Sequence, residues 1–407
     1  MALINSIEVK GFRSLADVTL ELGGLTVLIG RNNTGKTNLL DVLKFLSEAA
    51  QGKLSDAVQK RGGMRSLLFS RPDGTRGQEL SIEVGFVGVS CDVGPLKNGK
   101  PWRYSFSLRE QRETYAIARE EVAGVDLRGE LKRRAAESAG VAVISLPPEA
   151  VGPAPAAAYD AAELAVSQRQ CLPENSPGQW GAWAAGPWAR RCVVYGYPIL
   201  ETGPEAAVRK PQVLRPETLV SPDGSNLASV LYTLQSAGEH AAAYNDMCAT
   251  LSAAFPEFEE LRFPPEGGDG RILLRWREKG QKVGHSSFDL SDGTLSFLFL
   301  AALATAPGAP NPPFVFCIDE PEVGLHPHAI RLVAEMLQAA AERTQLVVAT
   351  HSPILVDGLK PEQVVIVEKG EDGATHFRRL PADELKEWLK EFSLGDLWLT
   401  GHLGERA

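Results

Sequence analysis

The sequence feature that most constrains the fold is an octapeptide near the N-terminus. Residues 30–37 read Gly-Arg-Asn-Asn-Thr-Gly-Lys-Thr and match the pattern GxxxxGK[ST] at every position. A buried apolar strand over 25–29 precedes this phosphate-loop pattern, and leucines at helical spacing follow it from Lys36 to about Glu48. Glycines let main-chain N–H groups face phosphate oxygens, and a helix N-terminus favours an anion. We therefore expect Lys36 to neutralise β- and γ-phosphates and Thr37 to ligate Mg²⁺; a chance glycine-rich turn is the alternative, which both flanking elements disfavour.

A second motif lies far along the chain, at 314–320. It reads Phe-Val-Phe-Cys-Ile-Asp-Glu, an apolar run that ends in two acids. A buried strand of this kind places its carboxylates at the carboxyl edge of a sheet, where ligands bind. We expect Asp319 to hold Mg²⁺ through water and Glu320 to act as the general base that polarises the attacking water. Taken alone, the run also fits a strand followed by a solvated acidic turn.

Two shorter motifs flank the acidic strand. Residues 290–294, Leu-Ser-Asp-Gly-Thr, open an apolar helix, and an ordinary N-cap alone would explain them. A cap that contains glycine is also an anion site. After the next buried strand, Thr-His-Ser-Pro at 350–353 places His351 near the acids, where it is expected to touch a γ-phosphate and the attacking water. A structural histidine at a strand end is the alternative.

The spacing of these motifs predicts an α/β fold. Strands that alternate with helices in the last third imply a mostly parallel sheet. The middle differs, because twelve prolines stand between Pro147 and Pro222 and proline breaks an interior helix. We expect short helices there, notably over 226–254, and disorder near 150–160. The predicted segments are an N-terminal lobe over 1–110, an inserted, mainly helical or irregular region over 111–285, and a C-terminal lobe over 286–407.

Composition narrows the class of protein. The 407 residues include 42 Lys and Arg against 51 Asp and Glu, a net charge of -9, which argues against a generally basic, nucleic-acid-coated surface but leaves a local patch open. No apolar run is long enough for a membrane helix, and the first ten residues do not resemble a secretory leader. Single, scattered cysteines fit reduced thiols rather than disulfides or a zinc site. We expect a cytoplasmic protein without a membrane partner.

The order of the motifs resembles one family. Phosphate loop, Leu-Ser-x-Gly-like signature, Asp-Glu strand and Thr-His follow one another as in the ABC-type ATPases. Three further stretches resemble the RecF/SMC/OLD branch and, more narrowly, the stand-alone RecF-like AAA ATPases of bacteria. They are Ile-Glu-Val-Lys-Gly-Phe-Arg-Ser-Leu at 7–15, Glu-Pro-Glu-Val-Gly-Leu-His-Pro at 320–327 and Ser-Leu-Gly-Asp-Leu-Trp-Leu at 393–399. The resemblance covers about 1–50 and 285–400, and the middle only weakly.

The resemblance implies a P-loop ATPase of ABC-ATPase type, with a mixed sheet and flanking helices, that binds ATP and Mg²⁺ and hydrolyses ATP. Two heads would sandwich two ATP molecules, so a second copy of the chain is the expected partner. Ser291, Asp292 and Gly293 would contact the nucleotide bound by that partner, residues 322–326 would form the D-loop, and His351 resembles the switch histidine. The implied nucleotide-binding residues are Arg13, Gly30, Asn32, Asn33, Thr34, Gly35, Lys36, Thr37 and Asn38.

Three further assignments are less specific. Gln168 is our candidate for the Q-loop glutamine at Mg²⁺, and a surface-helix residue is its alternative. The main basic cluster comprises Arg128, Lys132, Arg133 and Arg134, and we interpret it as a solvated helix face, with a DNA contact as the alternative. His326 stands where transporters often have Asp, and we reject a metal pair with His328 because no third ligand is spaced nearby.

The pathway remains open between two hypotheses. In the first, hydrolysis is coupled to DNA repair or genome maintenance, with DNA as a partner. In the second, the chain is the ATPase sensor or scaffold of an anti-phage defence system and acts with a separate nuclease or effector, since too little sequence follows His351 for the Toprim nuclease of OLD proteins. The long insertion and the Phe-Arg-Ser-Leu start disfavour a transporter subunit. Intact Lys36, Asp319 and Glu320 disfavour a non-hydrolysing scaffold.

Overall fold

The computed structural model divides into two compact units. The first comprises Met1–Val193 with Val365–Arg379, and the second comprises Val194–Val364 with Leu380–Ala407. The structure describes residues 4–51, 53–87, 102–111, 114–124, 132–135, 142–145, 192–305, 315–380 and 382–403. Both units therefore contain stretches from distant parts of the sequence, because the C-terminal hairpin belongs to the first unit.

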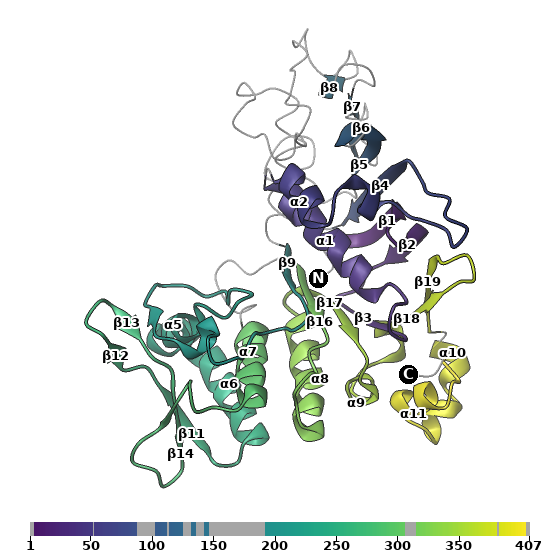
Figure 1. Ribbon diagram of the computed structural model, residues 1–407. Coiled ribbons are helices and arrows are strands. Elements are labelled where there is room, and N and C mark those ends of the chain that lie inside the picture. The colour runs from purple at the N-terminus through teal and green to yellow at the C-terminus, as the bar shows by residue number, and fades with distance from the viewer. Residues whose placement is uncertain are drawn as a thin grey trace. The chain divides into compact units, whose positions relative to one another are not determined.

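The first unit contains a five-stranded antiparallel sheet in the order β2-β1-β4-β5-β6 (Figure 1). The strands are β1 (Ile4–Phe12), β2 (Leu15–Glu21), β4 (Glu79–Phe86), β5 (Trp102–Gln111) and β6 (Thr114–Gly124). Alternate residues of β1 and β4 are buried, as expected where one face of a sheet meets the core. Strand β6 lies within 111–285, a region that the sequence predicted to be mainly helical or irregular.

Helix α1 (Lys36–Ala50) packs on this sheet through aromatic contacts. The ring of Phe45 lies 6.0 Å from that of Phe12 and 6.3 Å from that of Phe106, and all three are buried. Full burial of such a side chain stabilises the fold by about 1.5–3 kcal/mol. This packing holds the start of α1, where the phosphate loop ends. Two short helices follow, α2 (Leu54–Lys60) and α3 (Met64–Leu67).

Three more strands of the first unit adjoin in the order β19-β18-β3. They are β3 (Leu25–Ile29), β18 (Val364–Lys369) and β19 (Thr375–Arg379), and β18 pairs with β19 as an antiparallel hairpin. Every residue of β3 is buried, as expected for a strand inside a sheet. The phosphate loop thus leaves β3 beside a hairpin from the C-terminal part of the chain.

The second unit is centred on two parallel strands, β16 (Val315–Asp319) and β17 (Gln345–Thr350), which bring Asp319 opposite Ala349. The connecting helix α8 (Pro327–Ala341) packs beside α7 (Asp292–Thr305), and α9 (Pro353–Asp357) follows β17 (Figure 1). Helix α7 buries nearly all of its residues from Leu295 onward, so it is an interior helix. Tyr195 packs edge-on against Phe299 of α7.

The rest of the second unit contains small sheets and short helices. Antiparallel sheets form from β11 (Phe258–Arg262), β14 (Arg275–Glu278) and β15 (His285–Ser286), and from β10 (Gln212–Val213), β13 (Arg271–Ile272) and β12 (Pro265–Glu266). The helices are α5 (Leu227–Ser236), α6 (Ala241–Ala254), α10 (Ala382–Leu385), α11 (Leu394–Leu399), η3 (Ala207–Arg209), η4 (Gly238–His240), η6 (Pro361–Gln363) and η7 (Trp388–Lys390). Strand β9 (Cys192–Tyr195) adjoins β16. The helices predicted over 226–254 are present, but the strands after them were not predicted.

One sequence-based interpretation is wrong. Lys132, Arg133 and Arg134 lie in strand β7 (Lys132–Ala135), which pairs with β8 (Ala142–Ser145) as a hairpin, and not on a helix. The β-hairpin satisfies main-chain hydrogen bonds across the pair, which charge spacing along a helix does not reveal. Arg128, Gln168 and the stretch 150–160 lie outside the described residues, so their assignments stay predictions.

Across the residues that the structure describes, no helix combines the length and the apolar character that a membrane crossing requires.

Candidate functional site

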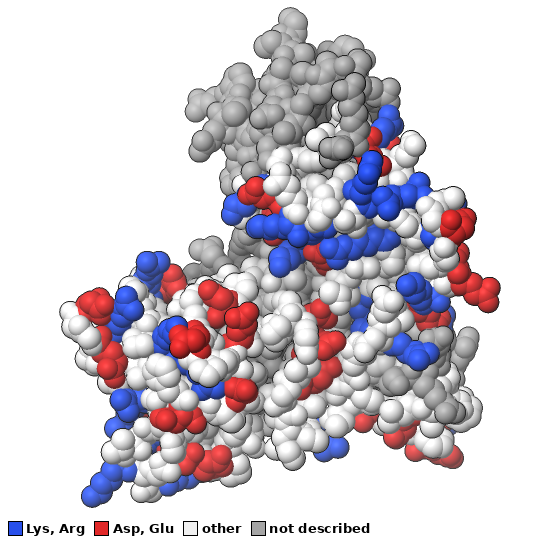
Figure 2. All heavy atoms as spheres, in the orientation of Figure 1, with Lys and Arg blue, Asp and Glu red and all other residues white. Residues whose placement is uncertain are grey.

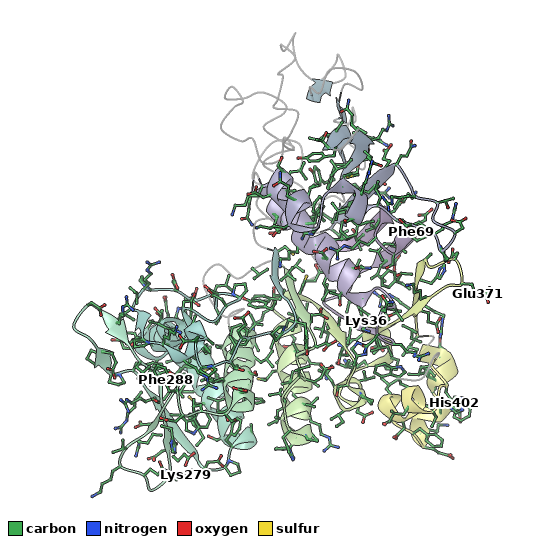
Figure 3. All side chains as sticks on the ribbon, viewed as in Figure 1. Lys36, Phe69, Lys279, Phe288, Glu371 and His402 are labelled. Carbon is green, nitrogen blue, oxygen red and sulfur yellow. The ribbon has the colours of Figure 1, made fainter. Side chains whose placement is uncertain are left out.

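The phosphate loop turns tightly between β3 and α1. Gly30 (φ 152°) and Gly35 (φ 109°) have backbone angles that favour glycine, and Gly35 is the N-cap of α1. Lys36 is 4% exposed, and its Nζ donates hydrogen bonds to the carbonyls of Gly30 (2.7 Å) and Arg31 (2.9 Å). The amine therefore reaches back across the loop to its first two residues. Figure 3 labels Lys36 at the start of α1. A fixed cation beside a helix N-terminus favours a phosphate group.

The other loop residues divide into exposed and buried ones. Asn32, Asn33 and Thr37 are exposed, so their polar groups are accessible to a ligand. Thr34 is buried, and its hydroxyl donates a 2.9 Å hydrogen bond to the carbonyl of Arg31 within the loop. The loop therefore maintains its curvature by internal bonds and presents the start of α1 to solvent.

The hairpin of β18 and β19 contacts the phosphate loop. Thr375, at the start of β19, is 1% exposed, and its hydroxyl donates a 2.7 Å hydrogen bond to the carbonyl of Thr34. The same hydroxyl lies 2.7 Å from the hydroxyl of Ser14, and a Cβ on Gly35 would lie only 2.1 Å from it. A Cβ on Gly30 would lie 2.2 Å from the carbonyl oxygen of Val367 in β18. Both motif glycines are thus required by the close approach of this hairpin.

Arg13 joins a charged network on the first turns of α1. Its main chain is left-handed (φ 47°), and its NH1 lies 3.0 Å from Asp41 Oδ2. Asp41 also pairs with Arg61 at 2.7 Å. Asn38 donates its side-chain N–H to Ser14 Oγ at 2.7 Å, so its amide has a protein partner. The structure places Arg13 and Asn38 next to one another beside the loop, as their assignment to one site requires.

In the second unit, the two acids follow β16. Asp319, its last residue, is 4% exposed. Glu320 is left-handed (φ 50°), and its N–H donates a 2.8 Å hydrogen bond to the carbonyl of Ala349 in β17. Its Oε1 lies 3.5 Å from Nε2 of His351, and both side chains are partly accessible to solvent. The sequence-predicted acids and histidine therefore meet at the carboxyl ends of two adjacent parallel strands.

Glu322 joins the turn after the acids to the histidine segment. Its Oε1 accepts hydrogen bonds from the hydroxyl of Thr350 (2.8 Å) and from the main-chain N–H of His351 (2.7 Å). Its Oε2 is buried and has no hydrogen-bond partner. Burial raises the pKa of this carboxyl above the ordinary value for glutamate. The side chain thus fixes the main chain of His351 relative to the strand end that carries Glu320.

The predicted signature motif lies at the start of α7. The N-cap that the sequence left as an alternative is present, because Ser291 Oγ accepts a 3.1 Å hydrogen bond from the N–H of Thr294. Ser291 and Asp292 remain exposed. A Cβ on Gly293 would lie 2.6 Å from the carbonyl oxygen of Gly324, so glycine lets the start of α7 approach the predicted D-loop. The start of α7 and the turn at Gly324 are therefore packed against one another.

The two nearby histidines have protein partners. His326 is the N-cap of α8, and its Nδ1 accepts a 3.3 Å hydrogen bond from the N–H of His328. His328 Nε2 lies 3.2 Å from the carbonyl oxygen of Ala253. Within the described ranges no three His, Cys, Asp or Glu side chains are grouped for metal binding.

Backbone strain coincides with the predicted site. Among the described residues, the non-glycine residues with positive φ are Arg13, Asn33 and Glu320. An L-residue in this region costs about 1–3 kcal/mol, and such strain persists where surrounding contacts impose it, often at functional sites. All three residues are ones that the sequence motifs select. The left-handed conformation thus occurs at three residues that the sequence analysis had selected, and their roles stay predictions.

The residues present fit a nucleoside triphosphate with Mg²⁺. The loop offers a buried ammonium group at a helix N-terminus, which suits phosphate. Thr37 in the first unit offers a hydroxyl oxygen and Asp319 in the second offers a carboxylate, and each is a hard oxygen donor of the type that Mg²⁺ prefers.

Two family models match the two halves of the motif set. Residues 3–92, which include the phosphate loop, match the family described as "AAA ATPase domain". Residues 215–357, which include signature, acids and His351, match the family described as "AAA domain, putative AbiEii toxin, Type IV TA system".

Curated relatives match over shorter stretches. The DNA replication and repair protein RecF of Rhodococcus erythropolis is 35% identical over 86 residues, 21% of each chain. The DNA repair protein RecN of Deinococcus radiodurans is 34% identical over 151 residues, 36% of this chain and 25% of that protein. The chain spans about a quarter or less of the length of the curated relatives it matches.

Solved structures match over nearly the whole chain. An Smc head bound to the C-terminal winged-helix domain of ScpA has a TM-score of 0.57 at 15% identity, covering 95% of this chain and 99% of that one. An Smc head of Pyrococcus furiosus, bound to the C-terminal domain of ScpA, has a TM-score of 0.55 at 13% identity, with 96% and 99% covered. The chain has the ABC-type ATPase fold, and its sequence is similar to RecF and Smc proteins. The predicted fold class and family resemblance are thereby confirmed.

The sequence analysis placed Glu322 in the expected D-loop over 322–326, but it did not predict the contacts by which Glu322 and two other residues support the motifs. Thr375 supports the phosphate loop, Glu322 fixes the His351 segment, and Arg209 binds the loop before the signature. Glu322 lies inside a stretch that carried the family resemblance, which was a usable signal. Thr375 and Arg209 have no motif around them, and only the folded chain reveals their contacts.

Proposed function

We propose that this RecF/SMC-like chain binds ATP with Mg²⁺ and hydrolyses it. The observation that carries the proposal is the Glu320–His351 pair at the carboxyl ends of β16 and β17, with Glu320 held in a strained left-handed conformation. A partly accessible carboxylate beside an imidazole is suited to accept a proton from water. The phosphate loop with its buried Lys36 supports the same function.

Each residue has a distinct role in this proposal. Lys36 neutralises the β- and γ-phosphates, and Thr37 and Asp319 hold Mg²⁺, which adds positive charge at the phosphates when bound. Glu320 takes a proton from the attacking water as the bond from water oxygen to the γ-phosphorus forms and the bond to the leaving oxygen of ADP breaks. His351 orients the water and the γ-phosphate, and Glu322 fixes the main chain of that histidine.

We further propose that two copies close on two ATP molecules. Ser291, Asp292 and Gly293 of one copy would contact the nucleotide of the other. Exposure of Ser291 and Asp292 at the start of α7 supports this role, because a contact made in trans requires an accessible surface. The dipole at the N-terminus of α7 favours a phosphate at that end.

The pathway we propose is DNA repair or genome maintenance. The names of the RecF and RecN relatives support it. Lys and Arg side chains also gather over the first unit on the face shown in Figure 2. Within the first unit, Arg103 pairs with Glu83 (3.2 Å) and Arg109 pairs with Glu79 (3.0 Å). A DNA contact made by these arginines would exchange the carboxylates for phosphates.

ATP turnover measured without DNA and with duplex, nicked or single-stranded DNA tests both statements. We expect basal turnover that Glu320→Gln abolishes, and stimulation by one of the DNA forms that weakens as salt rises. Wild-type protein without turnover would refute the ATPase. Turnover that no DNA form changes would refute the coupling to DNA.

A second candidate is an ATPase subunit of a defence system that acts with a separate nuclease. The description of the family that matches residues 215–357 names a toxin–antitoxin system, which favours this alternative. Co-expression with nucleases encoded beside the gene tests it: a stable complex whose nuclease activity depends on Glu320 supports the defence role, and a head that binds none of them excludes it.

A further inference from the structure

One buried arginine from outside the motifs holds the loop that precedes the signature. Arg209, the last residue of η3, is 7% exposed. Its NH1 donates hydrogen bonds to three carbonyl oxygens of that loop, those of Ser287 (2.8 Å), Phe288 (3.1 Å) and Leu290 (2.8 Å). Three of the four carbonyls over 287–290 therefore converge on a single guanidinium group.

The same guanidinium group reaches the signature itself. Its NH2 donates a 2.6 Å hydrogen bond to Oδ1 of Asp292, the first residue of α7. In return, the hydroxyl of buried Ser287 donates a 2.7 Å hydrogen bond to the carbonyl of Arg209. A planar fork of N–H donors can bind several acceptors in fixed directions, which a lysine ammonium cannot. The residues on both sides of Ser291 are thus fixed by one side chain.

This geometry sets which groups of the loop face outward. The carbonyls on the side of the loop that faces Arg209 point at its guanidinium group. The side chain of Phe288 stays half exposed, and Ser291 and Asp292 are exposed. Figure 3 labels Phe288 on the loop before α7. An exposed loop without such an anchor would sample several conformations and would lose that freedom on binding. Arg209 holds the loop in one conformation before any partner arrives.

The segment that carries Arg209 is itself anchored. Arg209 Nε donates to the carbonyl of Thr202 at 2.7 Å. Gln212 donates to the carbonyls of Ala207 (3.2 Å) and Gly224 (2.9 Å), and its Oε1 accepts the N–H of Ala228 in α5 at 2.7 Å. A continuous chain of hydrogen bonds therefore runs from α5 through η3 to the signature.

We propose that Arg209 is a positioning residue that preorganises the signature loop for its contact with the nucleotide bound by a second copy of the chain. The inference rests on the proposed ATP-dependent dimer. It adds that the segment 202–228, outside every ATPase motif, sets the geometry of that contact. Arg209 itself touches neither nucleotide nor water; it acts through Ser291, Asp292 and Gly293.

The test compares Arg209→Lys with wild type and with Lys210→Ala as the matched control. Lys210 is the next residue, is exposed, and pairs only with Glu205 among the ion pairs of the described residues (2.7 Å). For Arg209→Lys we expect nucleotide affinity of the single head within about twofold of wild type, since the phosphate loop is untouched. We expect turnover to be at least about tenfold slower, which corresponds to about 1.4 kcal/mol or more in the activation free energy. In the Glu320→Gln background, we expect Arg209→Lys to abolish the ATP-dependent dimer. Lys210→Ala should match wild type throughout.

Mixing distinguishes a positioning defect from general damage. Arg209→Lys has an intact phosphate loop and Lys36→Ala has an intact signature, so a mixed dimer contains one complete site. Turnover of the mixture should exceed the sum of the two variants measured separately, as it should for Ser291→Arg mixed with Lys36→Ala. A folded Arg209→Lys protein with normal turnover and dimerisation, or one that the mixture does not rescue, overturns the proposal.

Two outcomes need a separate measurement. If Arg209→Lys melts at a clearly lower temperature, Ser287→Ala, which loosens the same loop from its other side, replaces it and should give the same pattern; normal turnover of that variant would then overturn the proposal. If wild-type protein neither hydrolyses ATP nor dimerises with it in the Glu320→Gln form, the proposed function fails, and this inference fails with it. A defect of Arg209→Lys supports the proposal only if the wild-type protein hydrolyses ATP.

Discussion

The hydroxyl of Thr375 donates a 2.7 Å hydrogen bond to the main-chain carbonyl of Thr34, and 341 positions of sequence separate the two residues. The donor belongs to a hairpin near the C-terminus, and the acceptor belongs to the phosphate loop near the N-terminus. Because the bond is buried, each partner lacks a replacement from water. The conformation of the loop therefore depends on a segment that carries no ATPase motif.

Thr375→Val tests this dependence. The change removes the hydroxyl, keeps the branched shape and leaves the Thr34 carbonyl without this donor. We expect the free energy of unfolding to fall by about 1–3 kcal/mol, and nucleotide affinity to weaken as the loop loosens. Urea unfolding and titration with a fluorescent ATP analogue measure the two effects. Thr375→Ser keeps the hydroxyl and should retain the affinity; equal affinity for both variants would show that the bond does not shape the loop.

Lys36→Ala should abolish tight nucleotide binding. The ammonium group is buried across the loop, and loss of a charge-assisted contact with phosphate costs about 1.5–3 kcal/mol, or at least about tenfold in affinity. The exposed Lys44 on the same helix provides the control, because Lys44→Ala removes one charge without touching the loop. Isothermal titration with ATP measures both variants. Affinity that Lys36→Ala leaves unchanged would contradict the assignment of the loop.

Glu320→Gln should separate binding from turnover. The amide keeps the shape of the side chain but cannot accept a proton, so we expect turnover to fall by about 10²–10⁴-fold while ATP binding persists. ATP should then accumulate the dimer, which light scattering detects. Glu335→Gln, an exposed position on α8, is the control for removal of one negative charge. Turnover at the wild-type rate in Glu320→Gln would exclude Glu320 as the base.

Glu322→Gln should change the pH dependence of stability. Burial raises the folded-state pKa of Glu322, so its neutral form is the favoured one in the folded protein. The stabilisation is fully present below the unfolded-state pKa of about 4.3 and is lost as pH rises through the higher folded-state pKa. We therefore expect wild type to lose stability relative to Glu322→Gln as pH rises through that window.

Unfolding of both proteins in urea at several pH values measures this difference. The amide that Glu322→Gln introduces retains an oxygen that can accept hydrogen bonds from Thr350 and from the N–H of His351. Both proteins therefore keep these two hydrogen bonds, and only the ionisable group differs. A difference in stability that stays constant with pH, or that changes in the opposite direction, would show that Glu322 is ionised in the folded protein without cost.

The sequence by itself determined the local parts of the site. The phosphate loop, the acidic strand end and the signature are contiguous stretches, because the glycines, the lysine and the acids each act through the backbone turn on which they sit. Buried strands such as β3 and β16 followed from apolar runs, and α1 followed from leucines at helical spacing. The ABC-type ATPase fold therefore followed from short patterns in a fixed order.

Only the tertiary structure decided which distant residues hold those parts in place. Thr375 and Arg209 are common residue types in ordinary surroundings, and their roles arise from contacts with carbonyls far away in the sequence. The strand β7 likewise pairs with β8, and the spacing of charges over 128–134 carries no information on a partner strand. Periodicity and motifs describe neighbours along the chain, whereas hydrogen bonds to main-chain carbonyls join whichever segments folding brings together.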